Sequence, residues 1–220
     1  MFQRASSMIR GLLGRQESRR PTEGEIDLRS VHYSMPTIAA DEIALEAPMS
    51  DASEEAPQFH EDAWRQVEFL PKACQWDVQD MLGDYKQFEQ ENRTPNGWKK
   101  IFPRKLDPNA VVPMAALQLA SLLGAKLGPP PILTTSSALL GQVRNGFSIP
   151  LGPSTLLYGH EEGGHVMVLG AIVSADDGQV PLTNAFMKLR REQGLILVDW
   201  RSQMLLLDVK EGGDIEAWGP

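Results

Sequence analysis

Leu195-Ile196-Leu197-Val198-Asp199-Trp200 is a short apolar run, and a second run, Met204 to Val209, follows it after only three polar residues. Two such runs with a short gap between them are typical of a β-hairpin. Three further strand-like runs, at 138–143, 155–158 and 165–173, precede this pair. Because short connections join antiparallel neighbours, the C-terminal third of the chain is predicted to form a mostly antiparallel sheet.

Three segments have the pattern of helices. Residues 76–91 carry apolar side chains at spacings of three and four with acids between them, which indicates an amphipathic helix. Residues 181–193 repeat this pattern, and Gly194 is a suitable C-terminal cap. Residues 114–127 are apolar nearly all round, so we expect this helix to be buried. The sequence therefore predicts one α+β domain, residues 62–220, with a mostly antiparallel sheet and about three helices.

The composition changes near residue 62. Residues 1–20 hold five arginines against one glutamate, and are predicted to be a basic segment that is either amphipathic or disordered. Residues 21–61 are predicted to be an acidic linker containing Pro and Ser, and residues 21–62 hold eleven acids and one arginine. Such a composition buries too little apolar surface to offset the chain entropy lost on folding. A disordered tail is therefore expected before the domain.

Composition also restricts the class of function. Residues 63–220 hold 17 acids and 15 bases, and this near-neutral balance disfavours nucleic acid as a partner. The single cysteine, Cys74, excludes a disulfide within the chain and agrees with a reducing compartment, so we expect a cytoplasmic location. No run approaches the ~20 apolar residues of a membrane span, and residues 1–20 lack the apolar core of a signal peptide. Membrane contact is expected only through residues 1–20.

Two patterns resemble metal or thiol sites. His160 and His165 flank Glu-Glu-Gly-Gly, whereas a zinc peptidase helix needs its histidines four residues apart. The spacing of five and the two glycines favour a polar hairpin turn over a metal site. Cys74 is interpreted as a small half-buried residue, because only Lys72 is near enough in sequence to activate a thiolate.

Two charged groups have both a chemical and a plain interpretation. Asp199 and Asp208 lie on adjacent predicted strands, which can bring carboxylates together, but an exposed strand charge is the simpler interpretation. Lys99-Lys100 with Arg104 and Lys105 could bind an anionic surface, or could protect an edge strand from aggregation. We therefore assign no catalytic, cofactor-binding or metal-ligating residue, expect no cofactor, and do not expect an enzyme.

Parts of the chain resemble bacterial immunity proteins that accompany polymorphic or type VI secreted toxins. The resemblance lies in Asp62-Ala63-Trp64-Arg65-Gln66-Val67-Glu68-Phe69, in the polar helix that follows, in Gly97–Arg104 and in Leu195–Trp200. It implies a small, cytoplasmic, non-catalytic blocker of one toxin. Such proteins share no fixed inhibitory motif, so the resemblance carries over no binding residue.

The expected function is therefore protein binding, most concretely the inhibition of a cognate toxin by an immunity-type protein with one protein partner. The alternative is a structural or assembly protein that uses its basic N-terminus at a membrane or on nucleic acid. The charge of +4 over residues 1–20, followed by the acidic segment, favours this alternative.

Overall fold

The computed structural model describes residues 32–48, 55–106, 110–210 and 214–220. The chain from His32 to Pro220 forms one compact unit. The predicted basic segment, residues 1–20, lies outside the described residues, as do residues 21–31 and 49–54 of the predicted linker. No helix in the described part of the chain is long and apolar enough to cross a membrane.

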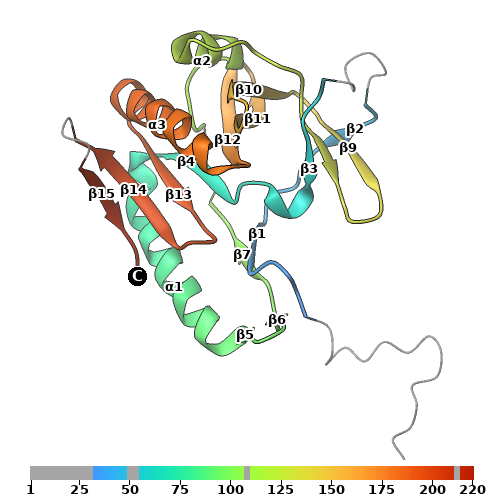
Figure 1. The fold of residues 1–220 in the computed structure, drawn as a ribbon, viewed down its shortest axis with the longest axis vertical. Helices are drawn as coiled ribbons and strands as arrows, with labels where there is room; N and C mark the ends of the chain where they lie inside the picture. The colour runs from blue at the N-terminus through green and yellow to red at the C-terminus, as the bar shows by residue number, and fades with distance from the viewer. Residues whose placement is uncertain (1–31, 49–54, 107–109, 211–213) are drawn as a thin grey trace, which may run out of the picture. The chain divides into compact units, whose positions relative to one another are not determined.

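The main sheet has seven strands in the order β10-β11-β12-β4-β13-β14-β15, and every neighbouring pair is antiparallel. The strands are β4 (Val67–Pro71), β10 (Gly146–Gly152), β11 (Thr155–Glu162), β12 (His165–Val173), β13 (Leu195–Asp199), β14 (Met204–Val209) and β15 (Ile215–Trp218). The predicted antiparallel sheet is confirmed. Figure 1 shows β4 between β12 and β13, so the earliest strand of this sheet joins its two later halves.

Three α-helices lie in the described residues, as predicted: α1 (Gln75–Asn92), α2 (Ala116–Leu123) and α3 (Gln179–Gln193). Short 3-10 turns precede β4, α1 and α3: η1 (Glu61–Ala63), η2 (Lys72–Cys74) and η3 (Asp176–Gly178). Gly194 ends α3 in the left-handed conformation expected of a cap, with φ of 66°. The predicted second helix is too long, because Gly124 ends α2 with φ of 72°. Its full burial is also wrong, because Leu117 is 63% exposed.

Alternating side chains of β13 build two cores on opposite faces of the sheet. Leu195 and Leu197 pack with Phe186 of α3, in the same core as α2. Ile196 and Val198 pack instead in a second core with Val78 and Leu82 of α1 and with Trp200. Figure 1 shows α3 and α1 on either side of the β13–β14 region.

Residues of the predicted linker form strands of the compact unit. They are β1 (Thr37–Ala39), β2 (Leu45–Glu46) and β3 (Gln58–His60), which pair with β7 (Phe102–Arg104), β9 (Leu139–Val143) and β8 (Ile132–Thr134). The predicted domain start at residue 62 is therefore too late. These strands have only two or three residues and their partners lie far along the chain, so local composition does not reveal them.

A small four-stranded sheet, in the order β2-β9-β8-β3, packs beside the main sheet. Leu133 and Val143 of this sheet share a third core with Trp64, Tyr158 and Val168. A further antiparallel pair, β5 (Arg93–Thr94) and β6 (Gly97–Trp98), follows α1 as a short hairpin.

Candidate surface groove and the ionic centre beneath it

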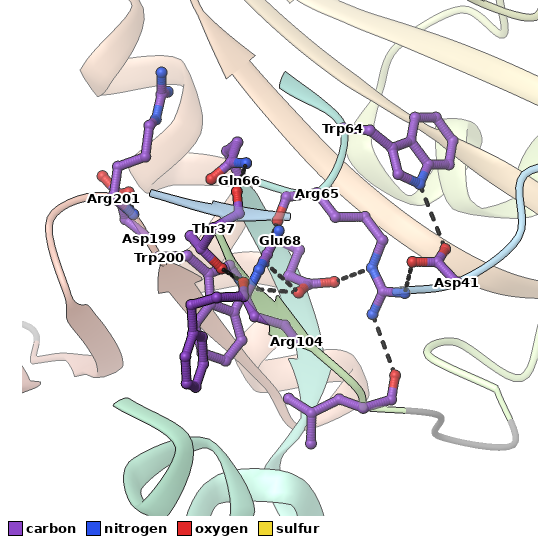
Figure 2. A network of polar contacts seen from close by, with 12 residues as sticks. Thr37, Asp41, Trp64, Arg65, Gln66, Glu68, Arg104, Asp199, Trp200 and Arg201 are labelled. Carbon is purple, nitrogen blue, oxygen red and sulfur yellow. Dashed lines mark hydrogen bonds and ion pairs between the residues drawn. The ribbon is translucent and has the colours of Figure 1, made fainter. Parts of the chain in front are cut away.

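A buried ionic centre formed by Arg65, Glu68, Arg104 and Trp200 lies on the α1 face of the main sheet; we call it the Glu68 centre. Glu68 of β4 is only 2% exposed. Its Oε2 accepts a 2.6 Å hydrogen bond from Nε of Arg65, and its Oε1 accepts one of 2.7 Å from the indole of Trp200. Nη1 of Arg104 lies 3.4 Å from the same Oε1 (Figure 2). One carboxylate thus joins residues from three distant segments.

A fourth charged group, the carboxylate of Asp41, balances the charges of Arg65, Glu68 and Arg104. Its Oδ1 lies 3.0 Å from Nη1 of Arg65, so two carboxylates face two guanidinium groups. Burial lowers the pKa of Arg65, but Glu68 and Asp41 outweigh burial and the pKa is raised. Burial lowers the pKa of Arg104 to about 10, and Glu68 offsets only part of that effect. A buried charge without its partner is costly, so these four groups depend on one another.

The turn that carries Arg65 is fixed by Tyr158 of β11. Arg65 has a φ of 55°, in the left-handed region that L-residues seldom adopt. The Tyr158 hydroxyl accepts a 2.8 Å hydrogen bond from the Arg65 backbone N–H and donates one of 3.1 Å to the carbonyl of Ala63. Gln66 donates to the carbonyls of Thr37 and Asp62, at 2.7 and 2.8 Å. The main sheet thus positions both the turn and β1.

A hollow of about 470 Å³ opens beside this turn, and we call it the acidic groove. Its apolar lining includes Ile38, Ile43, Leu45, Trp64, Leu133 and Leu140. Three acids, Asp41, Glu61 and Asp62, complete the lining. The groove therefore combines an apolar floor with negative charge.

A second hollow of about 380 Å³ adjoins the groove and shares Asp41, Ile43 and Trp64 with it. It adds Glu42, Glu161, Glu162, His160 and Arg144 to the charged lining. Glu161 accepts a 2.7 Å hydrogen bond from the backbone N–H of Ala116, and Arg144 lies 3.7 Å from Glu46. The two hollows together form one predominantly acidic surface.

The charge of this surface comes largely from the predicted linker. Asp41, Glu42, Glu61 and Asp62 all lie in residues 21–62, where the acidity was expected to belong to a tail. The compact unit from His32 onward holds 25 acids and 15 bases, a formal net charge of −10. The acids are evident in the sequence, but their position on one surface is not. No sequence signal shows this surface, because the residues around the acids come from the distant strands β8, β9 and β11.

Asp41 connects the groove to the Glu68 centre. It lies in the wall of both hollows, and its carboxylate is held by Arg65 and by the indole N–H of Trp64, at 3.0 and 3.5 Å. Figure 2 shows the carboxylate between these two side chains, with Glu68 on the far side of Arg65. Asp41, in the wall of the acidic groove, is therefore held in position by contacts with Arg65 and Trp64.

The two histidines of the predicted turn lie on different strands. His160 is within β11 and His165 begins β12, so the turn itself is only Gly163-Gly164. Within the described ranges, no group of three or more His, Cys, Asp or Glu residues is arranged to hold a metal ion. Burial lowers the pKa of His160, and nearby Asp41 opposes this in part.

Asp199 and Asp208 do not form a carboxylate pair. Asp199 pairs with Met204 across the hairpin, and Asp208 lies four residues further along β14, which is about 13 Å of strand. The Asp199 carboxylate instead accepts hydrogen bonds from the backbone N–H groups of Arg201 and Ser202, at 3.0 and 3.2 Å. Its role is to cap the hairpin turn.

The predicted basic cluster is smaller than its sequence implies. Lys99, Lys100 and Lys105 are exposed, but Arg104 is 3% exposed and belongs to the Glu68 centre.

Cys74 is a half-buried free thiol at the end of η2. Burial raises the pKa of this thiol, and Asp77 raises it further, so the neutral form is favoured.

A further hollow, of about 690 Å³, lies between α3 and β14 and has the opposite charge. Lys188, Arg190 and Arg191 line it, together with Asp208 and Met187. Of the three hollows described, the acidic groove and the adjoining hollow are the two that share Asp41, the carboxylate paired with Arg65 of the Glu68 centre.

No protein-family model matches the chain, and neither a curated protein nor a solved structure matches it.

Proposed function

We propose that this protein is a non-catalytic protein-binding protein of the immunity type, which inhibits a cognate toxin by covering part of its surface. The observation that supports this proposal is the acidic groove, with its apolar floor and charged rim. An apolar centre within a polar rim is the usual composition of a protein–protein contact. We propose the acidic groove as the centre of the contact.

The surroundings of the groove extend this contact. Leu139 and Leu140 of β9 are 55% and 39% exposed, and Leu140 lines the groove. A partner that covers them would bury apolar surface worth about 25 cal/mol per Å². Because Asp41 and Trp64 are held by the Glu68 centre, little freedom would be lost on binding, which favours affinity.

The acidic charge favours a basic partner and a fast encounter. The compact unit has a formal net charge of −10, and a field of one sign can raise association rates by about 10- to 1,000-fold. An inhibitor must bind its toxin before the toxin reaches its target, so fast association suits the proposed role.

With a single free cysteine, the protein suits a reducing compartment, and we propose that it acts in the cytoplasm.

A growth experiment tests the proposal. Candidate toxins, taken from the products of the genes next to the one for this chain, are expressed one at a time in bacteria with and without the full chain, and colony formation is compared. We expect co-expression to restore growth and the two purified proteins to elute together at a fixed stoichiometry. Unchanged killing together with separate elution would contradict the proposal.

The alternative is an assembly protein that acts through the basic residues 1–20 at a membrane or nucleic acid. The five arginines of this segment favour it. Deleting residues 1–20 separates the two proposals. Toxin protection should survive the deletion if the acidic groove is the contact surface, whereas localisation or assembly should fail if the alternative is correct.

A further inference from the structure

We infer that the acidic groove takes a basic segment of a protein partner, one in which apolar side chains alternate with lysine or arginine. This inference rests on the proposed function, because it assigns an occupant to the proposed contact surface. The two hollows that carry it share Asp41, Ile43 and Trp64, so one occupant can reach both.

The charges available to such an occupant can be identified. Asp41 faces Arg65 at 3.0 Å, and Asp62 lies 3.4 Å from His60, so both already have neighbours. Glu42, Glu61 and Glu162 form no ion pair with any other described residue. All three are exposed, and they line one hollow or the other. A basic segment would supply their missing partners.

The apolar floor sets the second requirement. Ile43 is shared by both hollows, and the partly exposed Ile38, Leu45 and Leu140 continue the apolar surface in the groove. A purely hydrophilic cation would leave this floor exposed to water. An occupant that places apolar side chains on the floor and cations at the rim satisfies both parts of the surface.

The same charge argues against nucleic acid in the groove. A phosphate backbone binds through released counterions and needs clustered lysine or arginine. The one lysine or arginine in the described lining of the two hollows is Arg144, which lies 3.7 Å from Glu46, and Arg65 is buried against Glu68 and Asp41. The groove would therefore repel phosphates.

A peptide experiment tests the inference on the full chain. The probe is a fluorescein-labelled twelve-residue peptide of alternating lysine and leucine, and binding is followed by fluorescence anisotropy at low and high salt. The comparison peptides replace leucine with serine, or lysine with glutamate. We expect the lysine–leucine peptide to bind at least about tenfold more tightly than either comparison peptide, with affinity falling as salt rises.

Matched pairs of variants locate the binding site. Glu42→Gln with Glu61→Gln removes two charges from the acidic surface, and Asp80→Asn with Asp84→Asn removes two exposed charges from α1. The first pair should weaken peptide binding about tenfold and the second should leave it within about twofold. Equal weakening by both pairs would show that only overall charge attracts the peptide, and would overturn the inference.

A second matched pair tests the apolar floor. Leu140→Ser changes the groove, whereas Leu117→Ser changes an exposed leucine of α2 outside it. Only Leu140→Ser should weaken binding of the lysine–leucine peptide. If Leu140→Ser has no effect, the groove does not hold the apolar side chains and the inference is wrong.

The growth experiment distinguishes this inference from the proposed function. If the Glu42/Glu61 variant loses the peptide but still protects cells as well as the original chain, toxin inhibition stands and the groove is not its contact surface. If the variant loses both the peptide and protection while the α1 variant keeps both, the groove is the contact surface. If the original chain binds the peptide in the expected manner but never protects, the immunity proposal fails while the groove assignment stands.

Discussion

The indole N–H of Trp200 donates a 2.7 Å hydrogen bond to Oε1 of Glu68, across 132 residues of sequence. The same indole ring lies 4.9 Å from the guanidinium carbon of Arg104, which also approaches Glu68. Trp200 therefore contacts both signs of charge in one buried centre. Its position at the end of β13 ties the C-terminal hairpin to β4 and β7.

Glu68→Gln should destabilise the protein strongly, because it leaves two buried guanidinium groups facing one remaining carboxylate. Removing one member of a buried ion pair costs about 3–5 kcal/mol of unfolding free energy. Urea denaturation followed by tryptophan fluorescence measures this loss. Glu192→Gln, which removes an exposed ion pair with Arg191, is the matched control and should change stability by less than about 0.5 kcal/mol. A similar small change for both variants would contradict the role given to Glu68.

Tyr158→Phe should destabilise the protein by about 1–3 kcal/mol, because it leaves the Arg65 N–H and the Ala63 carbonyl without their partner. The ring itself stays, so packing in the third core is preserved. Tyr33→Phe removes the hydroxyl of an exposed tyrosine and is expected to be neutral. Thermal unfolding of the two variants checks the difference, and equal melting temperatures would argue against a structural role for the Tyr158 hydroxyl.

The free energy of unfolding should fall as the pH drops below 6.5, because His160 binds a proton more readily in the unfolded chain. Burial and Arg65 lower the pKa of this histidine in the folded protein, and their effect exceeds the opposing effect of Asp41 and Glu162. The unfolded chain therefore binds the proton first, and the unfolding free energy rises with pH through this window. His160→Gln should flatten the profile between about pH 5 and 7, and exposed His165→Gln should not. The measurement is urea denaturation at a series of pH values.

Gly170→Ala and Gly83→Ala should change stability in opposite directions. A Cβ at Gly170 would lie 2.5–2.9 Å from the hydroxyl oxygen and two ring carbons of Tyr158, so the buried side chain would have to move. A Cβ at Gly83, in the middle of α1, meets nothing within 4 Å. We expect a loss of about 1–3 kcal/mol at Gly170 and a gain of about 0.5–1 kcal/mol at Gly83. Calorimetry of both variants tests this, and a stabilised Gly170→Ala protein would be incompatible with the packing described.

The parts of the fold that the sequence predicts are those with strong local signals. The periodic apolar residues of α1 and α3, the Gly194 cap and the two runs around Arg201 fix their elements within a few residues. Sequence periodicity also predicts β11 and β12, although His160 belongs to β11 and not to the loop.

The parts that the sequence does not predict depend on distant partners. β10 contains Pro150 and begins and ends with glycine, so its composition obscures a strand that the register with β11 stabilises. The strands β1, β2 and β3 are too short to show a period. Arg104 is a single-residue example of a position that depends on distant partners. Its neighbouring lysines in the sequence indicate a basic surface, but contacts with Glu68 and Trp200 hold its side chain inside the protein.

The long separation between Glu68 and Trp200 also has a consequence for biosynthesis. Domains fold as units during translation, and pairings between distant segments form slowly. The ribosome makes Glu68, Arg65 and Arg104 well before β13 and Trp200 exist, so the nascent chain carries these charges without their final partner. The parallel pairing of β3 with β8 likewise waits for some seventy residues of synthesis. Until Trp200 emerges, the polypeptide would remain open to chaperones and proteases, and the last hairpin would act as the step that commits it to the native state.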